Sequence, residues 1–490
     1  MPFYFFASVY CRDKMQIKEG IAFDDVLLVP KKSSVVSRKE VSTETFLTRK
    51  IKLNIPIVAA NMDSVCEATM AIALAREGGI GIIHRFLPIE KQVEKILRVK
   101  RAESIEIETP FTVFPDSTLH DVKKIMDEHG VHSILVVNSE RKLKGILTSR
   151  DMRFEKDFSK KVSELMTPEG KLITAPAGTT IERAKEILHE HRIEKLPLVS
   201  GDGTLSGMIA SKDILRGEKF PLAVKSRKGR LLVGAAVGVK KGFLERTEKL
   251  LEAGCDVICV DLAHGHSDLG INTVKEIKKA FGDVEVIAGN VATAEGCRDL
   301  ILAGADSVKI GIGPGSACTT RIVSGAGVPQ LTAIIECAKI AKDFSVPLIA
   351  DGGIRTSGDI AKAIAAGAST VMIGNIFAGT EEAPGTTVMR GGKKYKIYRG
   401  SASIDSAIDR ESRGEEIDAL DYVAEGVEGF VPFKGSVVEI IQQLVGGLKS
   451  GVSYCGAKNV SEMQMNAEFV KISEAGKKES SANKELIDVS

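Results

Sequence analysis

One loop carries the residue types best suited to chemistry. It spans residues 311–320 and reads Gly-Ile-Gly-Pro-Gly-Ser-Ala-Cys-Thr-Thr. Its three glycines allow a ligand to approach the backbone closely, and free N–H groups in such a turn suit a phosphate. Backbone N–H groups also favour the thiolate form of a cysteine, which is the nucleophilic form. The loop therefore predicts a phosphate site with Cys318 as nucleophile, in preference to a glycine-rich turn that holds a buried thiol.

The elements that position this loop form a regular series. The apolar, β-branched run Ser307–Ile310 leads into it and predicts a buried strand. Seven further apolar runs lie at 55–60, 80–84, 231–237, 257–262, 284–291, 347–351 and 370–374. Amphipathic stretches such as 67–77, 243–253 and 358–366 separate them. Strands that alternate with helices in this way predict an α/β protein, a (β/α)8 TIM barrel whose chemistry lies just after the strands.

An internal repeat interrupts the predicted barrel. Residues 117–126, 129–137 and 145–151 match residues 179–188, 191–199 and 207–213 at a constant offset, which indicates duplication. We expect a tandem module at 94–219, with repeats at about 94–155 and 156–219. The barrel would then comprise residues 15–93 and 220–476, with tails at 1–14 and 477–490.

Composition narrows the class of protein. The chain has 490 residues, 43% of them hydrophobic, which is enough for two or more packed domains. Lys+Arg 67 nearly balance Asp+Glu 65, so no nucleic acid or other polyanion is implied as a partner. No apolar run approaches the roughly 20 residues that span a membrane. The cysteines are scattered and lack the close spacing of metal ligands. This arrangement is typical of reduced thiols in a cytoplasmic enzyme.

The loop, with its continuation Gly327-Val-Pro-Gln330, closely resembles the active-site loop of the IMP dehydrogenase and GMP reductase family. The resemblance extends from residue 16 to about 480. It implies that Cys318 attacks C2 of the purine and forms an adduct that passes hydride to nicotinamide. Thr319 and Glu425 are expected to carry protons. NAD would lie across the barrel mouth, because the chain has no Gly-x-Gly-x-x-Gly fingerprint.

The resemblance also assigns binding residues. Asp351 would accept hydrogen bonds from ribose hydroxyls, the alternative being a strand-end aspartate that caps the next helix. Asp261 and Asn290 match positions beside the nicotinamide. The full set expected to contact IMP is Ser316, Asp351, Gly353, Gly374, Tyr398, Gly400 and Glu425.

The family also binds a monovalent cation through backbone carbonyls. The matching loop residues for potassium are Gly313, Gly315 and Cys318. The remaining carbonyls come from a C-terminal segment that usually reads Glu-Ser-His and here reads Glu479-Ser-Ser481. Backbone ligands tolerate changes of side chain, so the site stays an expectation.

The repeats resemble a pair of cystathionine-β-synthase (CBS) modules, which bind adenine or guanine nucleotides for regulation. In that family the Thr and Asp of a Gly-x-x-Thr-x-x-Asp string contact phosphate and ribose. Thr148 and Asp151 keep the string in the first repeat. The second repeat keeps Asp213 but has Ala210 in place of the threonine, which weakens the expected second site. A purely structural role for the pair is the alternative.

The segment expected to form a catalytic flap, about 401–424, departs from the family. Dehydrogenases carry an Arg-Tyr pair there, whose arginine activates the water that hydrolyses the covalent intermediate. Arg410 and Arg413 are present, but neither precedes a tyrosine. The reductase's glutamate is missing as well, with Ile404 at its place. We expect Arg410 or Arg413 to replace the flap arginine.

Other stretches favour the dehydrogenase reaction. Val328 and the runs 377–384 and 444–451 are dehydrogenase-like, whereas residues 60–63, Ala-Asn-Met-Asp, are slightly reductase-like. The resemblance therefore implies a cytoplasmic enzyme of guanine nucleotide biosynthesis that converts IMP, NAD and water to XMP and NADH. A homotetramer is expected, or an octamer assembled through the repeats. The alternatives are a GMP reductase that uses NADPH and a nucleotide sensor with impaired turnover.

Overall fold

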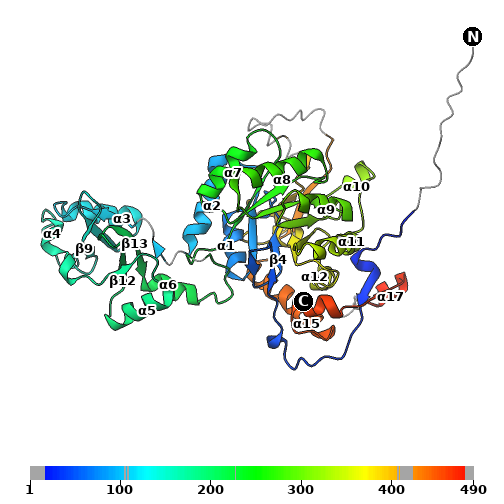
Figure 1. Cartoon of the computed structure of the whole chain (residues 1–490), viewed down its shortest axis with the longest axis horizontal. Helices are drawn as coiled ribbons and strands as arrows, with labels where there is room; N and C mark the ends of the chain where they lie inside the picture. The colour runs from blue at the N-terminus through cyan, green and yellow to red at the C-terminus, as the bar shows by residue number, and fades with distance from the viewer. Residues whose placement is uncertain are drawn as a thin grey trace, which may run out of the picture.

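The computed structural model describes residues 17–103, 106–107, 110–226, 228–404, 408 and 423–480. Figure 1 shows a barrel that carries most of the helices and a smaller body made from the inserted residues. Among the described residues, no helix combines the length and apolar character needed to cross a membrane.

Eight parallel strands close into a barrel, in the order β14-β15-β16-β17-β18-β19-β4-β5. The strands are β4 (Ile57–Ala59), β5 (Ile80–Ile83), β14 (Gly234–Val237), β15 (Val257–Asp261), β16 (Val286–Val291), β17 (Ser307–Ile310), β18 (Leu348–Asp351) and β19 (Thr370–Ile373). Every residue of β4, β5, β14, β17 and β19 is buried, as expected for strands covered on both faces. The predicted TIM barrel is confirmed, and all eight predicted strands lie in it.

Helices surround the barrel (Figure 1). They are α1 (Ala68–Arg76), α2 (Ile89–Ala102), α7 (Phe243–Glu252), α8 (Asp268–Phe281), α9 (Ala294–Leu302), α11 (Gln330–Asp343), α12 (Ser357–Ala365) and α15 (Val437–Tyr454). The predicted module boundary at residue 94 falls inside α2. Ile96 and Val99 of α2 belong to the barrel core, so the whole helix belongs to the barrel and that boundary is wrong.

Hydroxyl caps fix where several strand-to-helix loops end. In α8, α9, α12 and α15 the residue before the helix accepts a hydrogen bond from an N–H of the first turn, which supplies a partner that the helix itself cannot. The capping residues are Ser267, Thr293, Thr356 and Ser436. These caps help to define the ends of the loops that line the barrel mouth.

The inserted residues form two four-stranded sheets, β10-β9-β8-β7 and β11-β12-β13-β6. The first sheet and its helices comprise β7 (Thr112–Val113), α3 (Leu119–His129), β8 (Ser133–Val137), β9 (Leu143–Thr148), α4 (Val162–Leu165) and β10 (Thr167–Pro168). Of these, α4 and β10 lie beyond the predicted end of the first repeat at about residue 155. The second supplies β11 (Ala175–Pro176), α5 (Ile181–Glu190), β12 (Lys195–Val199), β13 (Leu205–Ala210) and α6 (Ser211–Glu218), while β6 (Glu106–Ile107) comes from the entering chain. The shared order strand, helix, strand, strand agrees with the duplication in the sequence. Leu135 and Ile146 of one repeat pack with Leu205 and Met208 of the other.

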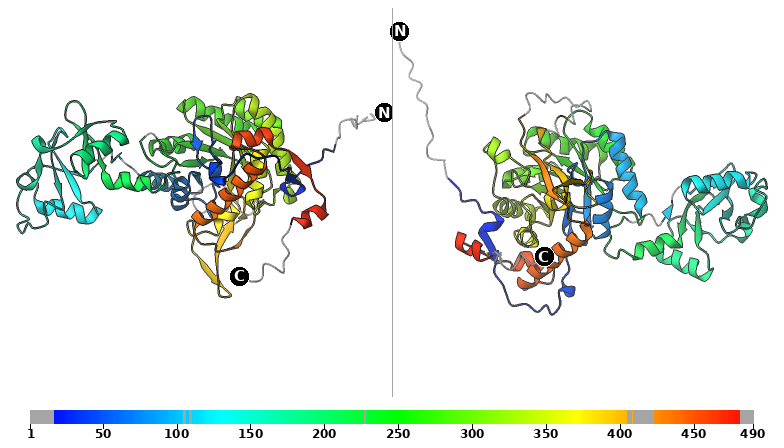
Figure 2. Two further views of the ribbon diagram at one scale, coloured as in Figure 1. Left: turned by 90° about the horizontal axis from the view of Figure 1, so that it is seen from below. Right: turned by 180° about the vertical axis from the view of Figure 1, so that it is seen from behind.

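Three smaller sheets complete the described fold. β1 (Val26–Leu28) pairs with β23 (Phe469–Lys471), and β2 (Thr45–Phe46) pairs with β3 (Lys52–Leu53). β20 (Val388–Arg390), β21 (Lys393–Arg399) and β22 (Glu428–Pro432) form an antiparallel sheet that extends away from the barrel (Figure 2). The predicted flap lies between β21 and β22.

Candidate functional site

A cavity of about 310 Å³ opens where the C-terminal ends of the barrel strands meet. Polar residues enter it from four strand ends: Asn61 after β4, Asp261 from β15, Asn290 from β16 and Asp351 from β18. The loop after β17 and residues beside β21 and β22 complete the wall. The site therefore lies at the end of the barrel where TIM-barrel chemistry occurs.

The loop after β17 needs its glycines. Gly311 and Gly313 have φ angles of 147° and 82°, a region that side chains with a Cβ rarely adopt. A Cβ at Gly311 would lie 2.0 Å from the carbonyl oxygen of Asp351. Arg321 holds the loop in this shape, because its guanidinium donates to the carbonyls of Ile312 and Val328. The loop can thus pass close to the next strand and present Cys318 to the cavity.

Cys318 begins a short chain of hydrogen bonds. Its Sγ lies 3.2 Å from Thr320 Oγ1, which donates to Glu425 Oε2 at 2.7 Å. A positioned hydroxyl and carboxylate can remove a proton from a reacting group and return it. The hydroxyl in this chain is that of Thr320, so the structure does not support Thr319 as the proton carrier. Thr319 instead donates its backbone N–H to the carbonyl of Glu425 at 2.9 Å.

Cys318 also differs from the other described cysteines in exposure. Six of them, Cys66, Cys255, Cys259, Cys297, Cys337 and Cys455, are buried, whereas Cys318 is half-buried and faces the cavity. Burial raises the pKa of Cys255 and of Cys259 to about 12, which keeps both as thiols at neutral pH. Among the described cysteines, Cys318 alone combines access with a polar partner that leads to a carboxylate.

Ser316 lies beside Tyr398, and Tyr398 lines the cavity. Ser316 Oγ donates to the Tyr398 hydroxyl at 3.4 Å, and a Cβ at Gly374 would lie 3.2 Å from that hydroxyl. Gly353, which follows β18 and has a φ angle of 80°, lies near Pro314 of the loop after β17. Burial raises the pKa of Tyr398, so its hydroxyl keeps its proton. The residues predicted to hold a phosphate are therefore neighbours, with hydroxyl groups and open backbone between them.

In the same cavity, Asp351, Asn290 and Asp261 surround a lysine that the sequence analysis missed. Lys309 Nζ lies 2.7 Å from Asp351 Oδ2 and 3.2 Å from Asp261 Oδ1, and it also donates to Asn290 Oδ1. Arg85, also missed, lies 4.0 Å from Asp261. The sequence could have indicated Lys309, because a charged residue within a predicted buried strand needs partners inside the barrel.

Several predicted site residues cannot be compared with the structure. Arg410, Arg413 and Ser481 lie outside the described residues, as do residues 1–14 and the side chain of Asp213. Gly313, Gly315 and Cys318 lie together in the loop, and the carbonyl of Gly315 already accepts the Cys318 N–H at 3.0 Å. In the described ranges no group of three His, Cys, Asp or Glu side chains could hold a metal ion. A potassium site made of carbonyls stays a prediction.

A second cavity, of about 600 Å³, lies between the two inserted repeats. Thr148 and Asp151 line it from the first repeat, and Thr148 Oγ1 donates to Asp151 Oδ2 at 2.7 Å. Its basic lining residues are Arg150, Arg153, Lys171, Arg192, Lys195 and Lys212, against the acidic residues Asp151 and Glu194. This excess of positive charge suits an anionic ligand.

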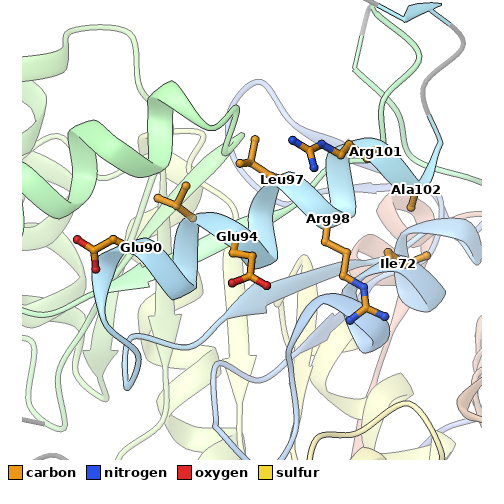
Figure 3. A pocket seen from close by; sticks show the side chains of 8 residues that line it. Ile72, Glu90, Glu94, Leu97, Arg98, Arg101 and Ala102 are labelled. Carbon is orange, nitrogen blue, oxygen red and sulfur yellow. The ribbon is translucent and has the colours of Figure 1, made fainter. Parts of the chain in front are cut away.

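A third hollow lies along the outer surface of α2 (Figure 3). Glu90, Glu94, Arg98 and Arg101 lie around apolar side chains such as Leu97. Its lining includes no cysteine, serine, threonine or histidine, so it does not compete with the barrel mouth as a reaction site.

Comparison with known proteins agrees with this geometry. A family profile for the IMP dehydrogenase / GMP reductase domain matches residues 20–483. The chain is 56% identical to the inosine-5'-monophosphate dehydrogenase of Aquifex aeolicus, over 95% of each chain. It is 52% identical to that of Nitrosopumilus maritimus, over 96% of this chain and all of the relative. A crystal structure of Trypanosoma brucei GMP reductase with guanosine 5'-monophosphate superposes with a TM-score of 0.86, at 48% identity, and covers 96% of this chain and 99% of that one. The chain belongs to the IMP dehydrogenase / GMP reductase family.

Proposed function

We propose that the protein is an NAD-dependent IMP dehydrogenase, which converts IMP, NAD⁺ and water to XMP, NADH and a proton. The observation that carries this proposal is the hydrogen-bonded series Cys318, Thr320 and Glu425 at the barrel mouth. Full-length identities above 50% to two inosine-5'-monophosphate dehydrogenases favour this reaction within the family.

In this reaction the Cys318 thiolate adds to C2 of IMP, and C2 gives up a hydride. Asp261 and Asn290 would hold NAD⁺, which would supply the hydride acceptor. The bond between Cys318 and the purine is then cleaved by water, which adds to C2 while the thiolate leaves. Glu425, acting through the Thr320 hydroxyl, is the described base that can take a proton from that water. Arg410 or Arg413 is proposed to share this task.

Residues in and beside the cavity are proposed to bind and orient the substrate. Tyr398 and the backbone at Gly400, which line the cavity, would hold the phosphate end together with the neighbouring Ser316, Gly353 and Gly374. The carboxylate of Asp351 would accept the ribose hydroxyls. Such fixed contacts keep C2 within reach of Cys318, which lowers the entropic cost of the attack.

GMP reductase activity is the second candidate, and one specific observation favours it. Residues 401–424 lack the Arg-Tyr pair. A reductase releases ammonia and needs no activated water, so its flap needs no such arginine. The reductase-like segment 60–63 also reaches the site, because Asn61 donates a hydrogen bond to Asp261. The solved relative with bound guanosine 5'-monophosphate is itself a GMP reductase.

A paired assay separates the two reactions. Purified protein is followed at 340 nm with IMP, NAD⁺ and potassium in one cuvette and with GMP and NADPH in the other. A steady rise in the first supports the dehydrogenase. A fall in the second, with no change in the first, assigns the reductase. If the absorbance changes in neither cuvette although the protein binds IMP, the remaining alternative is a nucleotide sensor without turnover.

We also propose that the inserted repeats are CBS modules that bind an adenine or guanine nucleotide. The cavity between the repeats supports this, because Thr148 and Asp151 line it together with six basic side chains. Such a ligand would regulate the barrel from a separate site. A cytoplasmic homotetramer, or an octamer formed through the repeats, is the assembly proposed from the family.

Potassium is proposed to bind the carbonyls of Gly313, Gly315 and Cys318. A cation there would stabilise the loop that carries the nucleophile. Replacing potassium by sodium in the productive cuvette should lower the rate, because the two cations differ in size and the same carbonyls would not suit both equally. An unchanged rate contradicts this site.

A further inference from the structure

Lys309 occupies an unusual position for a lysine. It belongs to β17, only 2% of its surface is exposed, and it lies at the floor of the barrel cavity. Its ammonium group meets side chains from three other strands, Asp261, Asn290 and Asp351. A buried charge is costly unless it is paired, so this arrangement needs an explanation in terms of what it holds in place.

The arrangement fixes one edge of the Asp351 carboxylate. Asp351 Oδ2 accepts from Lys309 Nζ at 2.7 Å and from Asn290 Nδ2 at 2.9 Å. Within the described part of the chain, the hydrogen bonds to this carboxylate all end on Oδ2. Oδ1 is therefore available to a ligand in the cavity that Asp351 lines.

The charges in this cluster favour the ionised forms of Lys309 and Asp261. Burial by itself lowers the pKa of Lys309, but the Asp351 and Asp261 carboxylates outweigh this effect and leave the pKa above its usual value. Burial likewise raises the pKa of Asp261, but Lys309 and Arg85 outweigh it and leave that pKa below its usual value. The cluster thus combines two lysine-paired carboxylates with a nearby guanidinium.

We propose that Lys309 is a positioning residue that makes the site selective for ribonucleotides. By holding Oδ2 of Asp351, it presents Oδ1 as an acceptor to the ribose hydroxyls. The inference rests on the proposed function, in that a purine nucleotide must bind the barrel mouth, and it holds for a dehydrogenase or a reductase.

Calorimetric binding of IMP and of 2',3'-dideoxy-IMP tests the proposal. The wild-type protein should bind IMP about tenfold or more tightly than the dideoxy analogue, since hydrogen bonds to a charged acceptor are strong. In Lys309→Gln the ratio of the dissociation constants for the dideoxy analogue and for IMP should fall towards one, because the hydrogen bond from the Lys309 ammonium that orients the Asp351 carboxylate is lost. The phosphate contacts remain, so binding of the dideoxy analogue should change little.

Lys100→Gln is the matched control. Lys100 is also buried and pairs with Asp256 at 2.5 Å, but Asp256 precedes β15, at the opposite end of the barrel. This variant should lose thermal stability but keep the wild-type ratio of the dissociation constants for the dideoxy analogue and for IMP. A ratio that falls equally in both variants would indicate a general structural effect and overturn the proposal.

Two further outcomes are decisive. If Lys309→Gln does not fold, the double variant Lys309→Gln with Asp261→Asn removes one of the two carboxylates that lose their lysine partner, and the ratio should still fall towards one. A wild-type ratio in either folded variant overturns the role of Lys309. Wild-type protein that binds neither IMP nor GMP would instead overturn the proposed function itself.

Discussion

The barrel mouth and the cavity between the inserted repeats are lined by different kinds of side chain. The barrel mouth gathers a nucleophile, a hydroxyl and three carboxylates from segments as far apart as residues 261 and 425. The cavity between the repeats is lined mainly by basic side chains and contains no cysteine. Buried, mutually paired charges suit a reaction, whereas exposed basic groups suit reversible capture of an anion. The difference separates catalysis from regulation, and substitutions in the two regions should have different consequences.

The largest effect should come from the nucleophile. Cys318→Ala should lower turnover by at least about a thousandfold, because no other described cysteine can reach the substrate. IMP binding measured by calorimetry should persist, since the phosphate and ribose contacts remain. Turnover close to that of the wild type would remove the barrel mouth from its role as the reaction site.

The second-largest effect on turnover should come from the proton path of Thr320 and Glu425. Thr320→Val breaks the link between Cys318 and Glu425 and should lower turnover by about a hundredfold, within the usual range for general acid–base catalysis. Thr319→Val is the neighbouring control and should stay near the wild-type rate, because its described contact with Glu425 uses the backbone. The reverse order of effects would restore Thr319 as the proton carrier.

A change in the repeat cavity should affect binding alone. Arg153→Glu should weaken the affinity for ATP or GTP by about tenfold, through loss of one charge-assisted contact. The rate without added ATP or GTP should not change. Lys124→Glu, which alters an exposed lysine of α3 outside this cavity, should leave nucleotide affinity as it is. Equal effects of both variants would mean that the cavity is not the binding site.

The smallest effect concerns stability. The nearby His84 and Lys95 lower the pKa of Glu67 to about 2, against the effect of burial. The carboxylate therefore stabilises the fold above about pH 4.5, and this contribution disappears as the pH falls through 2. Glu67→Gln should reduce the free energy of unfolding by about 1–2 kcal/mol at pH 7 and by less near pH 3.

The control for Glu67 lies in the second repeat. Glu186 pairs with Arg183 at 2.7 Å, but both side chains are more than 60% exposed. Glu186→Gln should leave the denaturation midpoint within error at both pH values, since exposed pairs contribute little. A loss as large as that of Glu67→Gln would contradict the contrast between buried and exposed pairs.

The sequence predicted the barrel well because its strands are apolar, short and regularly spaced. All eight predicted runs contain a barrel strand, and Cys318 and Glu425 do meet in space. The choice between Thr319 and Thr320 depended on the turn into α10 (Thr320–Val323), which adjacent hydroxyl residues do not reveal. The boundary at residue 94 failed because α2 is amphipathic over its whole length and continues to Ala102.

Lys309 shows what strand patterns miss. In the run Ser307–Ile310 a lysine looks like a tolerated polar residue, and only closure of the barrel brings Asp261, Asn290 and Asp351 around it. Its role depends on residues that lie 19 to 48 positions away in the sequence. Such a network follows from topology and cannot be read from local spacing.

The most direct test of covalent chemistry at Cys318 is the intact mass of the protein after rapid acid quenching. Incubation with IMP and NAD⁺, or with GMP alone, should add the same mass in either case, that of IMP less two hydrogen atoms. Peptide mapping should place this mass on Cys318, and Cys318→Ser should show none of it. Turnover without any such adduct, or an adduct on another cysteine, would contradict the mechanism.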